Sequence, residues 1–307
     1  MTIMPVLVQI FALFFVMAVG FALGKMTLLD RASVRGLSNL VIKVALPSLI
    51  LVSLQREFSH DLLGDALVTL AAAAAYYLGA AALGYLAVRA LGTPRRQVGA
   101  LVFSLAFSNA GFVGFPVIIS ILGPDALFLA AVHNVLFNLL AFSVGIVIVS
   151  GTGGEKFRFP VAKLFNINVL AAIAGFILFV LSVRLPPVIR QPLELLGNTT
   201  TPLAMLVVGA ILSHVPAKAV VGDWRLYAVS AVRLLALPAL AGFICLAAGA
   251  SPQLLGITVI VAGMPAASNT TLIAELYGGD TETASSIVFL STLFSVVTIP
   301  LMALLLA

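Results

Sequence analysis

Long apolar stretches separated by short polar connections run through the whole chain. Ten of them are close to the roughly 20 residues that a helix needs to cross the hydrocarbon core of a bilayer. Their approximate limits are Met4–Gly24, Leu37–Leu54, Leu62–Leu91, Val98–Leu122, Ala126–Ser150, Leu164–Val183, Leu193–Ser213, Leu226–Ala248, Leu254–Ala274 and Ala284–Leu306. The pattern predicts an all-α membrane protein with ten transmembrane helices.

Composition supports this interpretation. Of 307 residues, 62% are hydrophobic and 9% are charged, against about 45–50% and about 25% in a typical soluble domain. The ten stretches leave no room for a soluble domain. Lys25 follows the first stretch and no basic residue precedes it, which is the reverse of a secretory signal, so we expect this helix to stay in the protein. The single cysteine, Cys245, excludes a disulfide framework.

Basic residues are concentrated in alternate connections. The odd-numbered connections hold eleven of them: Lys25, Arg31, Arg35, Arg89, Arg95, Arg96, Lys156, Arg158, Lys163, Lys218 and Arg225. The even-numbered connections hold three, Arg56, Arg184 and Arg190. Because cytoplasmic loops of membrane proteins are enriched in Lys and Arg, we expect the odd connections in the cytoplasm and both termini outside. The positive net charge is therefore read as a topology signal and not as a nucleic-acid site.

The two halves of the chain show signs of a repeat. A flexible connection starting at Gly151 divides the sequence into residues 1–153 and 154–307, with five stretches in each half. A shift of 155 residues places Pro47 on Pro202 and Gly123-Pro-Asp125 on Gly278-Gly-Asp280. Five helices per half give the halves opposite orientations, which is the inverted-repeat architecture of many secondary transporters.

The fourth and ninth stretches contain corresponding interruptions, at Ser108–Pro116 and Gly263–Thr271. The residues expected to break the two helices are Gly111, Gly114, Pro116, Gly263 and Pro265. Irregular backbone inside a bilayer is tolerated only where protein or a watery cavity satisfies it, so paired breaks predict a binding cavity. The alternative is a pair of simple proline kinks.

Several motifs resemble the auxin efflux carrier family over nearly the whole chain. They are Asn109-Ala-Gly-Phe-Val-Gly-Phe-Pro116, the run from Pro265 to Asp280, the run from Leu290 to Pro300, Asn39, Pro47, Asn166-Ile-Asn168, and Arg233 five residues before Pro238. Because the long cytoplasmic loop of the plant PIN exporters is missing, the chain is more similar to the short bacterial members.

The resemblance implies two inverted five-helix repeats in which helices four and nine are broken and cross. It further implies a scaffold of helices one, two, six and seven, and a mobile transport domain of helices three to five and eight to ten. Transport would follow an elevator movement. The substrates would be small organic anions, such as malonate, other carboxylates or auxin-like acids. We expect a multi-pass protein of the bacterial inner membrane that forms a homodimer through its scaffold helices.

The resemblance also implies site residues. Pro116 and Pro265 match the crossover prolines, and Asn109 matches the asparagine that faces the substrate carboxylate. Asn134, with its neighbour His133, falls beside the site. Ser268 and Asn269 depart from the apolar plant pattern and would enlarge the polar end of the site. The physical reason is that half-helix N-termini present free amide donors and a partial positive charge to an anion.

Two basic residues fall within the apolar stretches. Lys43 is close enough to the cytoplasmic end to extend its stem to the interface, although it could also supply charge to the site. Arg233 is too deep for that and needs a partner, either carbonyl groups of a broken helix or the transported anion.

No Asp or Glu falls in the middle of a predicted span, which disfavours a proton relay based on a buried carboxylate and leaves Na⁺ or H⁺ open as the coupling ion. No cofactor, metal or nucleotide motif is recognisable. The sequence therefore favours a secondary carrier and not an enzyme, with an anion channel, or a membrane sensor or enzyme using the same cavity, as alternatives. Ser108 and Ser268 have no evident base for hydrolysis.

The topology can be tested by cysteine labelling in a Cys245→Ala background. A cysteine introduced at position 153 should react with an impermeant reagent only from the cytoplasmic side, and cysteines at both termini only from outside. A C-terminus labelled from the cytoplasm would contradict the count of ten spans.

Overall fold

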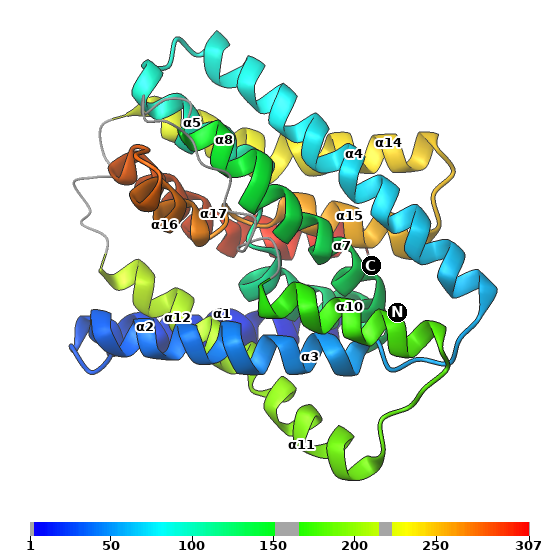
Figure 1. Ribbon diagram of the computed structural model, residues 1–307. Helices are drawn as coiled ribbons and strands as arrows, with labels where there is room; N and C mark the ends of the chain where they lie inside the picture. The colour runs from blue at the N-terminus through cyan, green and yellow to red at the C-terminus, as the bar shows by residue number, and fades with distance from the viewer. Residues whose placement is uncertain (1–2, 151–165, 215–222, 307) are drawn as a thin grey trace.

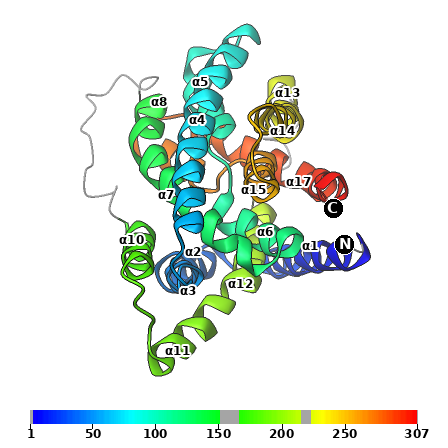
Figure 2. The same ribbon diagram turned by 90° about the vertical axis from the view of Figure 1, so that its right-hand side faces the viewer.

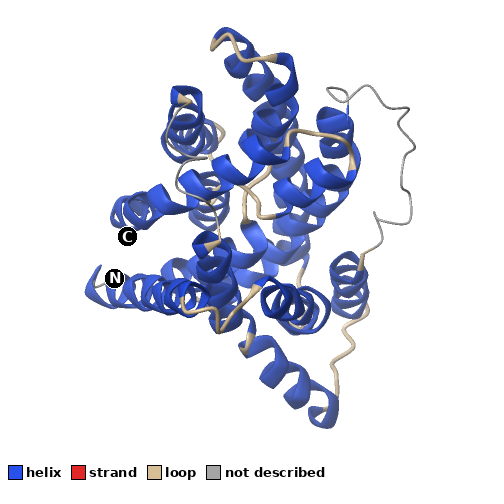
Figure 3. Cartoon of the chain, turned by 90° about the vertical axis from the view of Figure 1, so that its left-hand side faces the viewer, coloured by secondary structure: helices blue, strands red, loops and turns tan. Residues whose placement is uncertain are grey.

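The computed structural model describes residues 3–150, 166–214 and 223–306, and almost all of these residues are helical (Figures 1 and 3). The β pairing found among them is an isolated antiparallel bridge between Ser108 and Ala266. The predicted all-α class is therefore confirmed. The central connection, residues 151–165, lies outside the described residues.

The helices of the first half follow one another along the chain with few interruptions. They are α1 (Ile3–Lys25), α2 (Arg31–Leu40), the π-helical turn η1 (Val41–Ala45), α3 (Leu46–Ser53), α4 (His60–Ala90), α5 (Arg95–Ala106), the π-helical turn η2 (Ala110–Gly114), α6 (Phe115–Leu122), the short 3-10 turn η3 (Pro124–Ala126), α7 (Leu127–Leu140), the π-helical turn η4 (Ala141–Gly145) and α8 (Ile146–Ser150).

The described residues of the second half are also mostly helical. Their helices are α10 (Ile167–Val180), α11 (Pro187–Asn198), α12 (Thr200–Ser213), α13 (Trp224–Ala231), the π-helical turn η6 (Val232–Ala236), α14 (Leu237–Ala247), α15 (Pro252–Gly263), α16 (Asn269–Leu276) and α17 (Thr281–Leu306).

Within the described ranges, seven helical segments are long and apolar enough to cross a membrane. Three shorter apolar helices accompany them, Ala110–Leu122, Ile167–Val180 and Pro252–Gly263. Each of the ten ranges expected from hydropathy overlaps one of these segments. The chain is therefore a multi-pass membrane protein, and the inverted relation of its halves stays a prediction.

The helices pack in two groups (Figure 2). In one group, α1 pairs with α12, and α3 packs between α10 and α11. In the other, α4 packs against α5 and α7, α14 pairs with α15, and α17 contacts α5, α13 and α16. The half-helix α6 lies between the groups and contacts both α1 and α15.

The connections lie at two opposite ends of the molecule (Figure 1). Residues 26–30, 91–94 and 277–280 lie at the end drawn on the left, and residues 54–59, 181–186 and 248–251 at the other, where α1 begins and α17 ends. Which of these ends faces the cytoplasm stays a prediction.

Three of the prolines that lie within helical segments are preceded by a π-helical turn. Pro47, Pro116 and Pro238 each follow a π-helical turn, η1, η2 and η6, whose last residue is two positions earlier. Proline lacks an N–H group and its ring crowds the carbonyl one turn back. The wider π turn displaces that carbonyl, so the helix axis can continue. The expected break at Pro116 is therefore wrong in position, because this proline lies within α6.

The α1–α12 pair is held at backbone contact distance by glycines. A Cβ atom built on Gly209 would lie 1.9 Å from the Met17 carbonyl oxygen, and one on Gly20 would lie 2.2 Å from that of Leu206. Small residues of this kind allow membrane helices to approach closely and gain dispersion energy. The pair is therefore closed to any larger side chain at these positions.

Substituting Gly209→Ala should force α1 and α12 apart and lower the free energy of unfolding by about 1–3 kcal/mol, the usual effect of overpacking. The measurement is the thermal unfolding midpoint of detergent-purified protein. Gly64→Ala is the matched control, since its added methyl group would meet no atom within 4 Å in the described residues. Equal midpoints for the two variants would contradict the close packing of this pair.

Candidate functional site

Two broken helices cross near the centre of the molecule. The helix α5 ends at Ala106 and α15 ends at Gly263, and an extended segment follows each. The two segments run antiparallel: the Asn109 amide donates to the Pro265 carbonyl oxygen at 2.8 Å, and the Ala267 amide donates to that of Phe107 at 3.1 Å. Each break thus satisfies part of the backbone that the other leaves free, as the interior of a bilayer requires.

The predicted breaking residues are distributed unevenly around this crossing. Pro265 lies within the second break, whereas the first break is at residues 107–109 and Pro116 follows it by seven residues. Gly111 and Gly114 lie in the π-helical turn η2. Gly263 ends α15, where a Cβ atom would lie 2.6 Å from Met302 Sδ on α17, so a larger residue would require this contact to shift.

Beyond the crossing, two new helices begin side by side. The first starts at η2, where the Asn109 carboxamide accepts a hydrogen bond from the Phe112 amide at 3.3 Å and donates one to Ser268 Oγ at 2.9 Å. The second is α16, which starts at Asn269. Among the described residues, no hydrogen bond occupies the amides of Gly111, Ser268 and Asn269. Both helix N-termini therefore offer free donors.

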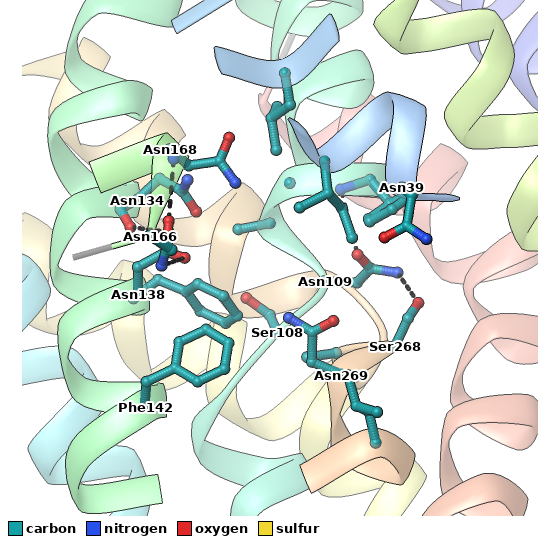
Figure 4. Close-up of a pocket in the computed structure, with 18 residues that line it drawn as sticks. Asn39, Ser108, Asn109, Asn134, Asn138, Phe142, Asn166, Asn168, Ser268 and Asn269 are labelled. Carbon is teal, nitrogen blue, oxygen red and sulfur yellow. Dashed lines mark hydrogen bonds between the residues drawn. The ribbon is translucent and has the colours of Figure 1, made fainter. Parts of the chain in front are cut away.

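These N-termini border a cavity of about 260 Å³ between the two helix groups (Figure 4). Asparagine and serine side chains supply its polar lining: Asn39, Ser108, Asn109, Asn134, Asn138, Asn166, Asn168, Ser268 and Asn269. Its lining residues, all within the described part of the chain, include no Asp, Glu, Lys, Arg or His. The cavity is polar without carrying a charged side chain.

Four of the asparagines form one side of the cavity in Figure 4. Asn166 caps the start of α10 through its side-chain oxygen and donates to Asn138 Oδ1 at 3.1 Å. The Asn138 side chain in turn donates to the Asn134 carbonyl oxygen at 2.9 Å. Two buried polar atoms of the lining, Asn168 Oδ1 and Ser108 Oγ, have no hydrogen-bond partner in the described residues. Such atoms are available to a ligand or to water.

The structure places some of the site residues expected from the sequence at the cavity and others away from it. Asn109, Asn134, Ser268, Asn269 and Gly111 line the cavity. Of the residues expected to bind the substrate or to supply charge, His133, Lys43 and Arg233 do not line it. The expected helix-breaking residues Gly114, Pro116, Gly263 and Pro265 do not line it either. Asn138, which the sequence analysis did not single out, does line it; its position four residues after Asn134 on one helix face was a usable signal.

The expectation that His133 and Lys43 belong to the site is corrected by their surroundings. His133 is buried but does not line the cavity, and its Nδ1 atom lies 3.2 Å from the Tyr77 hydroxyl of α4. Successive residues of a helix point about 100° apart, and here Asn134 lines the cavity whereas His133 packs against α4. Lys43 is exposed on the surface of η1, as a side chain that extends along the helix toward the interface would be.

The partners of Arg233 are carbonyl groups of the broken helices, which is the first of the two alternatives that the sequence analysis left open. The Arg233 guanidinium is 1% exposed and donates to carbonyl oxygens at the C-terminal ends of both α5 and α15. The acceptors are Leu105, Val261 at 3.2 Å and Met264 at 2.9 Å. It thus lies on the crossing but outside the cavity.

A second cavity of about 630 Å³ adjoins the first, because Ser268 lines both. It lies between α2 and α12 on one side and α16 and α17 on the other. Its ionisable residues are Arg31, Arg35, His214, Glu275 and Glu282. Two lining residues of the first cavity, Leu46 and Phe112, belong to an extensive apolar cluster of the described residues. The first cavity therefore borders ionisable side chains on the side of the second cavity.

Comparison with known proteins agrees with a transporter. A family model described as "Membrane transport protein" matches the chain twice, over residues 5–159 and 156–303. An "Uncharacterized transporter" of Methanothermobacter thermautotrophicus is 29% identical over 284 residues, which cover 92% of each chain.

Two further relatives have similar descriptions. Another "Uncharacterized transporter", from Methanocaldococcus jannaschii, is 25% identical over 86% of this chain and 87% of its own length. A "Putative malonate transporter" of Rhizobium meliloti is 27% identical over 64% of this chain and 63% of its own. Since the family model covers both halves of the sequence, the chain belongs to this membrane transport protein family, the auxin efflux carriers.

Proposed function

We propose that the protein is a secondary carrier of small organic anions, and that the cavity at the helix crossing is its substrate site. The observation that carries the proposal is the lining of this cavity, where two helix N-termini and seven asparagines meet without a charged side chain. Free N–H groups at a helix N-terminus and the helix dipole favour an anion. Neutral donors hold it without the tight ion pair that would slow its release.

The orientation of the broken helices strengthens the preference for negative charge. The C-terminal ends of α5 and α15, which carry partial negative charge, meet the Arg233 guanidinium. The N-terminal ends of η2 and α16, which carry partial positive charge, border the cavity. The crossing thus separates the two signs of dipole charge and presents the positive one to the substrate.

The size of the cavity favours a small acid. Pockets that enclose drug-sized ligands have volumes of about 300–1,000 Å³, and this one measures about 260 Å³. Donors lie on both sides, with Asn109 and Ser268 on one and Asn168 on the other (Figure 4). A dicarboxylate could engage both sides at once. The relative described as a malonate transporter agrees with this substrate class, and auxin-like acids are the second candidate.

The cavity adjoins the larger one at the Arg31 end, and its lining residue Phe112 belongs to an apolar cluster. Access from the Arg31 end alone would suit an alternating-access carrier better than a channel. In the proposed cycle, the domain that carries the crossing slides along the α1–α3 and α10–α12 scaffold, as in an elevator, and opens the site to the other side. We further propose that the Arg31 end faces the cytoplasm of a bacterial inner membrane.

The proposal is tested with purified protein reconstituted in liposomes, by uptake of labelled malonate against a panel of unlabelled acetate, malonate, succinate, indole-3-acetate and a neutral amide of malonate. We expect saturable uptake that carboxylates inhibit and the amide does not. Current that rises linearly with anion concentration would indicate a channel instead. Inhibition by the amide as strong as by the acids would contradict anion recognition.

Asn109 should matter most among the side chains of the cavity, because its carboxamide caps η2 and orients Ser268. Asn109→Ala removes one donor from a water-poor site and should weaken binding of the best acid by about 1–3 kcal/mol. Asn109→Asp should abolish it, since a fixed negative charge would repel the substrate. The measurement is the ligand-induced rise of the unfolding midpoint.

Asn198→Ala is the matched control for this experiment, as Asn198 is exposed at the end of α11 and away from the cavity. Unchanged affinity in Asn109→Asp would remove Asn109 from the substrate site.

A further inference from the structure

Arg233 occupies a position at which other transporters with discontinuous helices bind a dissociable cation. The last carbonyl groups of a helix have no partner within it and carry partial negative charge. At this crossing two such helix ends, those of α5 and α15, converge on one point. In transporters with discontinuous helices, converging carbonyls of this kind coordinate Na⁺.

The contacts of the guanidinium match that ligand set. Three backbone carbonyl oxygens, those of Leu105, Val261 and Met264, accept its N–H groups, and the Tyr76 hydroxyl accepts a fourth at 3.0 Å. No carboxylate in the described part of the chain forms an ion pair with Arg233. The positive charge is therefore balanced by helix ends and not by an acid. Because a guanidinium stays protonated and covalently attached, it remains there through every step of a cycle.

We propose that Arg233 is a tethered cation that takes the place of a dissociable coupling ion at the helix crossing, so that the protein needs no Na⁺ to hold its two broken helices together. The consequence for transport, that uptake does not depend on Na⁺, rests on the carrier function proposed above. The role of Arg233 in holding the two broken helices together does not rest on that function, since it concerns the folded protein alone.

Removing the tether should convert the crossing into a site for a free cation. Arg233→Ala leaves the three carbonyl oxygens and the Tyr76 hydroxyl facing an emptied space. In choline chloride its unfolding midpoint should fall by about 10 °C, as expected when several buried carbonyl groups lose their hydrogen-bond donor. Sodium or methylguanidinium ions, added at constant ionic strength, should bind there and restore part of the midpoint in a saturable way.

The experiment compares thermal unfolding of the wild type, Arg233→Ala, Arg233→Lys and Lys43→Ala in NaCl, methylguanidinium chloride and choline chloride. Lys43 is the matched control, because it is also a basic residue of a π-helical turn but is exposed. We expect the unfolding midpoint of the wild type to be the same in all three salts, and likewise that of Lys43→Ala. Arg233→Lys should be less stable and equally insensitive to the salt, since it keeps a tethered charge.

Two results would overturn the proposal. One is an Arg233→Ala protein whose lowered midpoint no cation raises, which would make the guanidinium a packing element only. The other is a wild type whose midpoint or uptake depends strictly on Na⁺, a result that can be obtained even if Arg233→Ala does not fold. A wild type that transports no organic anion would reject the proposed function, but the substrate-free titration would still decide the role of Arg233.

Discussion

Hydrogen bonding of backbone that leaves its helix inside the membrane is the constraint on which the rest of this structure depends. Each unpaired N–H or C=O group in hydrocarbon destabilises the protein by several kcal/mol. The two breaks meet this requirement together, through the antiparallel pairing of residues 107–109 with residues 265–267. Each break supplies hydrogen-bond partners to the other, which agrees with the interruption of both halves of the sequence at corresponding places.

At the crossing, the helix ends with partial negative charge lie on one side and those with partial positive charge on the other. Both C-terminal ends meet Arg233 on one side, and both N-terminal ends meet the asparagine-lined cavity on the other. The anion preference proposed for the cavity thus arises from backbone geometry, and the side chains adjust it. This explains how a cavity without any Lys or Arg in its lining can attract negative charge.

The sequence predicts the fold well because the bilayer imposes length and polarity on every helix, and each of the ten predicted ranges overlaps an apolar helix. It predicts Asn109, Ser268 and Asn269 as cavity residues because breaks and amides coincide there. It misplaces the first break at Pro116, because local propensity does not reveal that a π turn accommodates this proline. The sequence does not reveal which of His133 and Asn134 lines the cavity, nor which groups bind Arg233. Both depend on which helices pack together.

The most direct test of the central claim, that the crossing binds an organic anion through neutral donors, is to locate a bound anion. Bromomalonate bound to the purified protein can be found by the anomalous scattering of its bromine in a crystal. We predict a peak inside the cavity, between Asn109, Asn168 and Asn269. A peak confined to the outer cavity beside Arg31 and Arg35, with the inner cavity holding only water, would contradict the claim.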